Sequence, residues 1–161
     1  MYPQLQDVKN YLSISSTDDD FLLGLQLTQA IKIFEELTGR VFVATTDTSR
    51  TFYSDDRAIV NRRKFNFYDD ICSITSLTIN GNLIASNKYR LPFNKPYSHI
   101  EVFPTSDYFF ENYSTTQDPS SFVIVGKWAY SEECPRDIFG ALLRLTAWLY
   151  HQKDNAADYD R

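Results

Sequence analysis

Residues 35–42, Glu35-Glu36-Leu37-Thr38-Gly39-Arg40-Val41-Phe42, decide the fold class of this chain. Before this stretch, apolar side chains recur every three or four residues from Leu23 onward, which is the spacing of an amphipathic helix. Gly39 suits the left-handed conformation that ends many helices. After it, short runs of β-branched and aromatic residues replace the helical period. We therefore predict a long helix that ends at Gly39 and a β-rich region behind it.

The segment before the long helix predicts a shorter helix and an acidic helix start. Pro3 suits a first helical turn, and Leu5, Val8 and Leu12 follow at helical spacing. We interpret the run Asp18-Asp19-Asp20 as caps for the free amides of the long helix, and as a favourable charge for its dipole. A cation loop would need alternating oxygen ligands and a glycine, which this run lacks.

The long helix is too apolar for one neighbour. Leu22, Leu25 and Ile33 add apolar surface beside its main stripe. A helix with so wide an apolar surface is expected to contact more than one partner. These three residues are therefore candidates for a subunit interface.

The middle of the chain predicts several short strands. Asn80-Gly81 is the strongest hairpin signal, and residues 122–128 predict a central strand covered on both faces. Residues 104–121 predict a long loop. The other predicted strands are residues 41–44, 51–53, 58–60, 74–79, 83–84, 89–91 and 100–103.

A third helix follows Pro135, with a stripe of Ile138, Leu142, Leu145 and Leu149. We predict an α+β fold: a small helical bundle, made of the N-terminal helices and the C-terminal helix, with a β-rich insertion between the second and third helices. The expected organisation is a single domain over 1–161. Its helical core is 1–40 and 135–151, its β-rich insertion is 41–134, and 152–161 is a flexible tail.

Composition limits the function classes. The chain has 161 residues, 43% of them hydrophobic, which is enough for one core. Its net charge of −5 argues against general nucleic-acid binding, which depends on lysine and arginine. Two cysteines, Cys72 and Cys134, are too few for a disulfide framework, so we expect free thiols in a cytosolic environment. We expect no signal peptide and no membrane span.

Catalytic patterns are weak throughout the sequence. His99 and His151 lie in unrelated contexts, and no nucleophile-elbow or metal-ligand spacing is present. Asp55-Asp56 and Asp69-Asp70 are typical turn pairs. We therefore predict that the protein is not an enzyme and needs no metal or other cofactor.

Two clusters leave alternatives open. Arg62, Arg63 and Lys64 are flanked by Phe65 and Phe67, so they either contact nucleic acid with base stacking or form a charged hairpin turn or a neighbour contact. The net charge favours the second alternative.

The aromatic stretch at residues 108–113, with Tyr108, Phe109 and Phe110, either meets a partner or folds back onto the sheet. The two alternatives carry equal weight, and the three residues are also candidates for the subunit interface.

The order of these motifs resembles the tailed-phage head–tail connector (adaptor) family. The N-terminal part matches in Val8…Tyr11-Leu12, the acidic run and the stretch from Leu37 to Phe42. Residues 71–77, Ile-Cys-Ser-Ile-Thr-Ser-Leu, look like that family's strand P-I-x-S-I-x-S. Residues 123–130 and Pro135-Arg136-Asp137-Ile138 are similar to its passage G-x-x-G-Y…P-x-D-I. The sequence departs from the pattern at Asp70, where proline is usual, and at Ala129, where glycine is frequent.

The resemblance implies a structural virion protein that forms a ring under the portal, extends the DNA channel and joins the capsid to the neck or tail. Its partners would be the portal, copies of itself, a neck (stopper) or tail protein, and DNA passing without sequence-specific binding. It would be located in the virion neck after synthesis in the bacterial host cytoplasm. The candidate portal-binding residues are Trp148, Tyr150, His151, Lys153, Tyr159 and Arg161.

Two other classes stay open at this point. A neck stopper or tail-completion protein would share ring assembly but have a mostly β core. A nucleic-acid-binding module would depend on Arg62, Arg63 and Lys64, which would then contact DNA in the channel or elsewhere.

Overall fold

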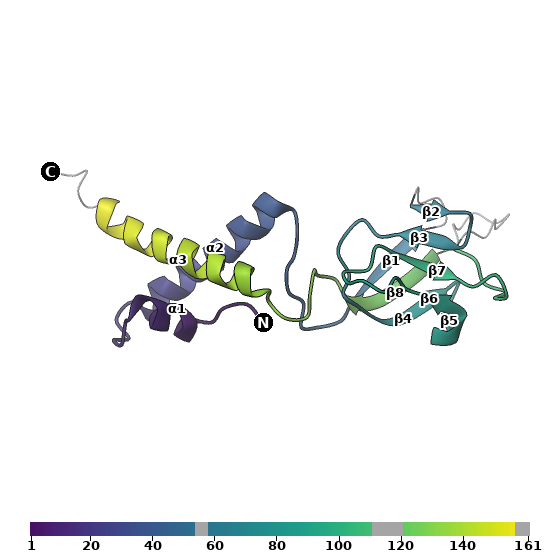
Figure 1. Cartoon of the computed structure of the whole chain (residues 1–161), viewed down its shortest axis with the longest axis horizontal. Helices are drawn as coiled ribbons and strands as arrows, with labels where there is room; N and C mark the ends of the chain where they lie inside the picture. The colour runs from purple at the N-terminus through teal and green to yellow at the C-terminus, as the bar shows by residue number, and fades with distance from the viewer. Residues whose placement is uncertain (54–57, 111–120, 157–161) are drawn as a thin grey trace. The chain divides into compact units, whose positions relative to one another are not determined.

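The computed structural model describes residues 1–53, 58–110 and 121–156. Contacts divide the chain into two compact units, Met1–Phe42 with Glu133–Arg161, and Val43–Glu132. The first is helical and the second is made of two antiparallel sheets, which confirms the predicted α+β fold with a β-rich insertion between the second and third helices. Figure 1 shows the elements of each unit.

The helical unit contains α1 (Leu5–Leu12), α2 (Asp20–Thr38) and α3 (Arg136–Ala156). Val8, Leu23, Leu27 and Tyr150 form its buried cluster, so all three helices contribute to one small core. Gly39 ends α2 with φ +65°, as predicted. Helix α3 continues to Ala156, so it includes the first five residues of the segment that we expected to be flexible.

The β-unit holds two four-stranded antiparallel sheets. The first has the order β1-β8-β4-β5, and the second has the order β2-β3-β7-β6. In chain order the strands are β1 (Thr48–Tyr53), β2 (Ile59–Val60), β3 (Lys64–Asn66), β4 (Ser73–Ile79), β5 (Asn82–Ile84), β6 (Tyr89–Arg90), β7 (His99–Val102) and β8 (Ser121–Lys127), with a 3₁₀ turn at η1 (Ser86–Lys88).

Two hairpin turns use left-handed residues. Asn80 and Gly81, with φ +50° and +79°, join β4 to β5 as the sequence predicted. Asn61 and Arg62, with φ +52° and +61°, join β2 to β3. Strand β3 was not predicted, because three residues that follow a charged run are too few to show the alternation of apolar and polar residues that marks a strand. Pairing with β7 places it in the sheet.

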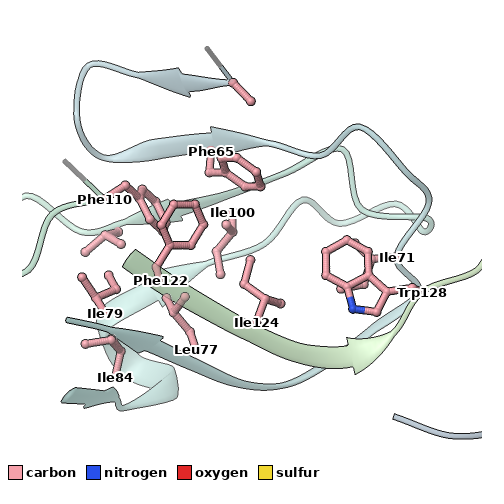
Figure 2. Packing of buried hydrophobic residues seen from close by; sticks show 12 residues of the cluster. Phe65, Ile71, Leu77, Ile79, Ile84, Ile100, Phe110, Phe122, Ile124 and Trp128 are labelled. Carbon is pink, nitrogen blue, oxygen red and sulfur yellow. The ribbon is translucent and has the colours of Figure 1, made fainter. Parts of the chain in front are cut away.

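In the core of the β-unit, a cluster of aromatic rings packs among aliphatic side chains (Figure 2). The Phe122 ring lies 4.9 Å from the rings of both Phe65 and Phe110, measured between centroids. Phe52 lies 5.8 Å from Trp128, so the cluster continues along the sheet. Such ring pairs add attraction beyond the area that they bury.

Two strand predictions need correction. Strand β8 is central, between β1 and β4, but it is buried on one face only: Phe122 and Ile124 are buried, while Val123 and Val125 are half-buried. A run of apolar residues in this strand therefore does not mean that both faces of the strand are covered. Residues 41–44 do not form a strand either, since Val43 makes only an isolated bridge to Ser131.

Candidate functional site

The described residues offer no group of three or more His, Cys, Asp or Glu side chains placed to hold a metal ion. Burial is the main cause that raises the pKa of Cys72 and of Cys134, so both thiols stay protonated near neutral pH. Burial also lowers the pKa of His99. None of the described helices is long and apolar enough to cross a membrane.

The acidic run at the start of α2 makes tertiary contacts instead of caps. Asp19 occupies the N-cap position without a side-chain cap bond. Its carboxylate accepts hydrogen bonds from the Tyr150 hydroxyl and, at 3.1 Å, from Lys153 Nζ. Asp20 pairs with the nearly buried Lys9 at 2.6 Å. The capping interpretation was wrong for Asp19, because a phenol and an ammonium from α3 take its carboxylate.

These contacts lower the pKa of Asp19. The hydrogen bond from Tyr150 is the largest cause, and the bond from Lys153 comes next. Lys153 also lies 4.0 Å from the centre of the Tyr150 ring. Hydrogen bonds to the ionised carboxylate favour that form, so this cluster ties α3 to the start of α2 at neutral pH.

The candidate portal-binding residues therefore separate into two groups. Trp148 is 58% exposed and His151 is exposed, so both are available to a partner. Tyr150 is buried and Lys153 is half-buried, and both are engaged by Asp19. Tyr159 and Arg161 lie outside the described residues.

Helix α2 exposes large apolar side chains. Of the three predicted interface residues, Leu25 is 53% exposed, whereas Leu22 and Ile33 are half-buried. The sequence argument missed Phe21 and Leu37, which are 85% and 82% exposed. Both lie next to polar residues at the ends of α2. A large apolar side chain beside a polar run was the signal that could have identified them in the sequence. Single exposed apolar side chains are common on protein surfaces, so these residues are candidates for contact with a partner by their size and exposure alone.

The basic cluster contacts its own loop. Arg63 Nη1 donates to the carbonyl of Phe103 at 2.7 Å, and its guanidinium lies 4.4 Å from the centre of the Phe109 ring. The Arg62 guanidinium lies 5.5 Å from the same ring. Lys64 stands opposite Glu101 in the ladder of β3 and β7. Arg62 and Arg63 thus contact the loop that follows β7.

The described part of the aromatic stretch folds back onto the sheet. Phe110 is buried in the aromatic core, and its amide donates to the Arg62 carbonyl at 3.0 Å. Tyr108 and Phe109 are half-buried. Residues 111–113 lie outside the described residues. Phe110 is therefore not available to a neighbouring subunit, so its assignment to a subunit interface was wrong.

Comparison with known proteins supports the fold. A scan against protein-family models found no match, and a search of curated proteins found none. Among solved structures, the chain is similar to one from a structure described as the neck of an empty GTA (gene transfer agent) particle, computed with C6 symmetry. The TM-score is 0.60 at 15% identity, and the match covers 92% of this chain and 78% of the other. At this identity the likeness establishes a shared fold.

Proposed function

We propose that this chain is a head–tail connector adaptor, a subunit of a ring that lies under the portal of a phage-like particle. One observation carries the proposal: 92% of the chain shares its fold with a chain from a particle neck. The motif order from Val8 to Tyr150 supports the same assignment independently, because it resembles the adaptor family.

In this proposal the protein is structural and acts without chemistry or cofactor. Its partners are the portal, neighbouring copies and a further neck or tail protein, and DNA passes through the ring. A net charge of −5 suits a channel wall, because few cations are available to hold phosphates. The protein would be made in the bacterial host cytoplasm and end in the virion neck.

The helical unit is the proposed site of ring and portal contacts. Phe21, Leu25 and Leu37 leave apolar area on α2 that a neighbouring copy would cover, and Trp148 offers a similar anchor on α3. Large aromatic and aliphatic anchors of this kind carry most of the binding energy at interfaces. One face of a subunit would dock on a different face of the next, so that rotation closes the ring.

The test is to mix the full-length chain with the portal protein encoded in the same genome. We expect sedimentation to show a complex with the portal, and electron microscopy to show a ring of added density on it. A stopper or tail-completion protein would instead leave the portal unbound until an adaptor is added. Binding of random DNA at physiological salt, or the absence of any portal complex, would contradict the proposal.

A paired substitution tests the helical surface. Replacing Phe21 and Leu37 by serine is expected to reduce the portal-bound ring at least tenfold, because the variant loses two apolar anchors. Phe93→Ser is the matched control, since Phe93 is 99% exposed on a loop of the β-unit. Equal loss with the control would show that exposed rings act non-specifically.

A further inference from the structure

The outer face of the first sheet is free of charge across its central rows. One row runs over all four strands, with Thr51 opposite Val123, Val123 opposite Thr78 and Thr78 opposite Leu83. Along β8, Val123 lies between the buried residues Phe122 and Ile124, and successive side chains of a strand point to opposite faces. The row of Val123 therefore faces outward. The next row is Ser49, Val125 and Ser76. We call these seven residues the neutral face.

The neutral face is accessible. Leu83 is 70% exposed, and Thr51 and Ser49 are exposed as well. Charge begins at the end of the sheet, where Lys127 is paired with Glu132 at 2.6 Å and where the Asp47 carboxylate accepts a hydrogen bond from the Thr75 hydroxyl. In a chain with 23% charged residues, none of the seven residues in these two outward rows carries a charge.

The second sheet shows the contrast. Its outward row places Lys64 opposite Glu101 and Glu101 opposite Arg90, with an ion pair of 2.7 Å between the last two. That row is ordinary solvated surface. Loss of charged residues, rather than bulk apolarity, is what distinguishes the centre of a protein interface from such a surface.

The edge of the same sheet supports the same conclusion. Strand β1 is an edge strand of six residues, paired with β8 without a bulge. The other edge strands of the two sheets are short: β2 and β6 have two residues each, and β5 has three. Natural proteins keep free edges short or block them with proline or charged residues. Strand β1 has no proline, and its single charged residue, Arg50, lies in the inner row opposite Ile124 and pairs with Asp69. The β1 edge is therefore the longest edge strand of the two sheets, and its position beside an uncharged face indicates a surface that is covered in the assembled state.

We propose that the neutral face and the β1 edge form a contact between copies of this chain. The occupant is a second copy, because the chain shares its fold with a chain from a neck of C6 symmetry, in which each chain is repeated around the axis. In such a ring the neutral face meets a different face of the next copy, and an uncharged face adds no repulsion between chains that each carry −5. The inference rests on the proposed ring function, and it adds a β-unit contact to the helical one.

The test introduces charge into the neutral face of the full-length chain. Leu83→Glu and Thr51→Glu are each expected to raise the concentration for half-assembly about tenfold or more, because each would bury an unpaired carboxylate. Val60→Glu is the matched control, since Val60 is 39% exposed on the outer face of the second sheet. Its half-assembly concentration is expected to stay within about twofold of the wild-type value.

Sedimentation velocity over a concentration series, alone and with the portal, gives the readout, and thermal unfolding shows that each variant folds. Assembly of Leu83→Glu and Thr51→Glu at wild-type concentrations would overturn this inference while leaving the ring intact. An equal effect of Val60→Glu would overturn it too. A wild-type chain that never self-associates, even on the portal, would overturn the proposed function itself.

Discussion

The two units of this protein are stabilised in different ways. The β-unit buries a cluster of twelve residues, four of them aromatic, and its three phenylalanines, Phe65, Phe110 and Phe122, are almost inaccessible. The buried cluster of the helical unit has four members, Val8, Leu23, Leu27 and Tyr150, and is supplemented by polar contacts to Asp19 and Asp20. The same helical unit exposes Phe21 and Leu37.

This difference suits the proposed ring, in which the β-unit supplies most of the stability and the helical unit supplies contacts to partners. The larger apolar core gives the β-unit more internal stabilisation, since burial of apolar area is the main favourable term in folding. The helical unit has a smaller buried cluster and exposes Phe21 and Leu37, which partners would cover in the proposed ring. The following substitutions test this division, from the largest expected effect to the smallest.

Truncation of the β-unit core has the largest expected effect. Phe122→Ala removes a ring that lies within 5.3 Å of three others, and the central strand cannot close around the gap. We expect a loss of about 3–5 kcal/mol in the free energy of unfolding, measured by urea denaturation. A loss below about 1 kcal/mol would mean that the aromatic cluster collapses easily.

Gly126→Ala tests the close approach of β8 and β4. A Cβ atom at Gly126 would lie 2.1 Å from the backbone oxygen of Ser73, which cannot turn away as a side chain would. We expect destabilisation of about 1–3 kcal/mol by thermal or urea unfolding. Gly140→Ala is the control: among the described atoms none lies within 4 Å of its Cβ position, and α3 should gain about 0.5–1 kcal/mol. Destabilisation by both would contradict the steric explanation.

Tyr150→Phe tests the polar contact of the helical unit and carries a pH signature. The pKa of Asp19 is lowered from 3.8 in the folded chain, so its stabilising effect is complete above the unfolded pKa and is lost as pH falls through the folded one. Because Tyr150 is the largest cause, the variant should be less stable than wild type near pH 6. That difference should shrink in acid. Thermal midpoints from pH 7 down to pH 3 measure it.

The exposed Tyr11 on α1 supplies the control for that experiment. Tyr11→Phe should follow the wild-type midpoint at every pH. A constant difference between Tyr150→Phe and wild type over the whole range would show that the hydroxyl acts by packing and not through the Asp19 carboxylate.

Leu25→Ser has the smallest expected effect on the free chain. Leu25 is 53% exposed, so its loss should change the free energy of unfolding by no more than about 0.5 kcal/mol. The portal-bound ring should nevertheless weaken, because the same side chain would be buried there. Leu23→Ser, at a fully buried position of the same helix, should instead destabilise the free chain. A large loss of stability with Leu25→Ser would place its side chain in the core.

Periodicity was sufficient to predict the helices, most strands and the fold class. Gly39 and Asn80-Gly81 could be located because the conformations they adopt, with φ of +65°, +50° and +79°, are rare for other residues. Strand β3 and the burial of Phe110 were not predictable in this way, because both depend on neighbours distant in sequence.

Candidate contact residues show the same limit. Trp148 and Leu25 were identified from size and position and are exposed, but Tyr150 had the same appearance in sequence and is buried against Asp19. Their difference depends on which residues face α2 from α3, a matter of packing rather than of local pattern.

Local sequence therefore determined which segments are helices and which are strands, because hydrophobic period and turn chemistry act over a few residues. Only the tertiary structure decided which apolar and charged side chains remain free for partners. Val123 and Phe122 are neighbours in one apolar strand, yet pairing and sheet packing bury one and turn the other outward. Exposure is a property of the whole set of contacts, so it cannot be assigned residue by residue from the chain.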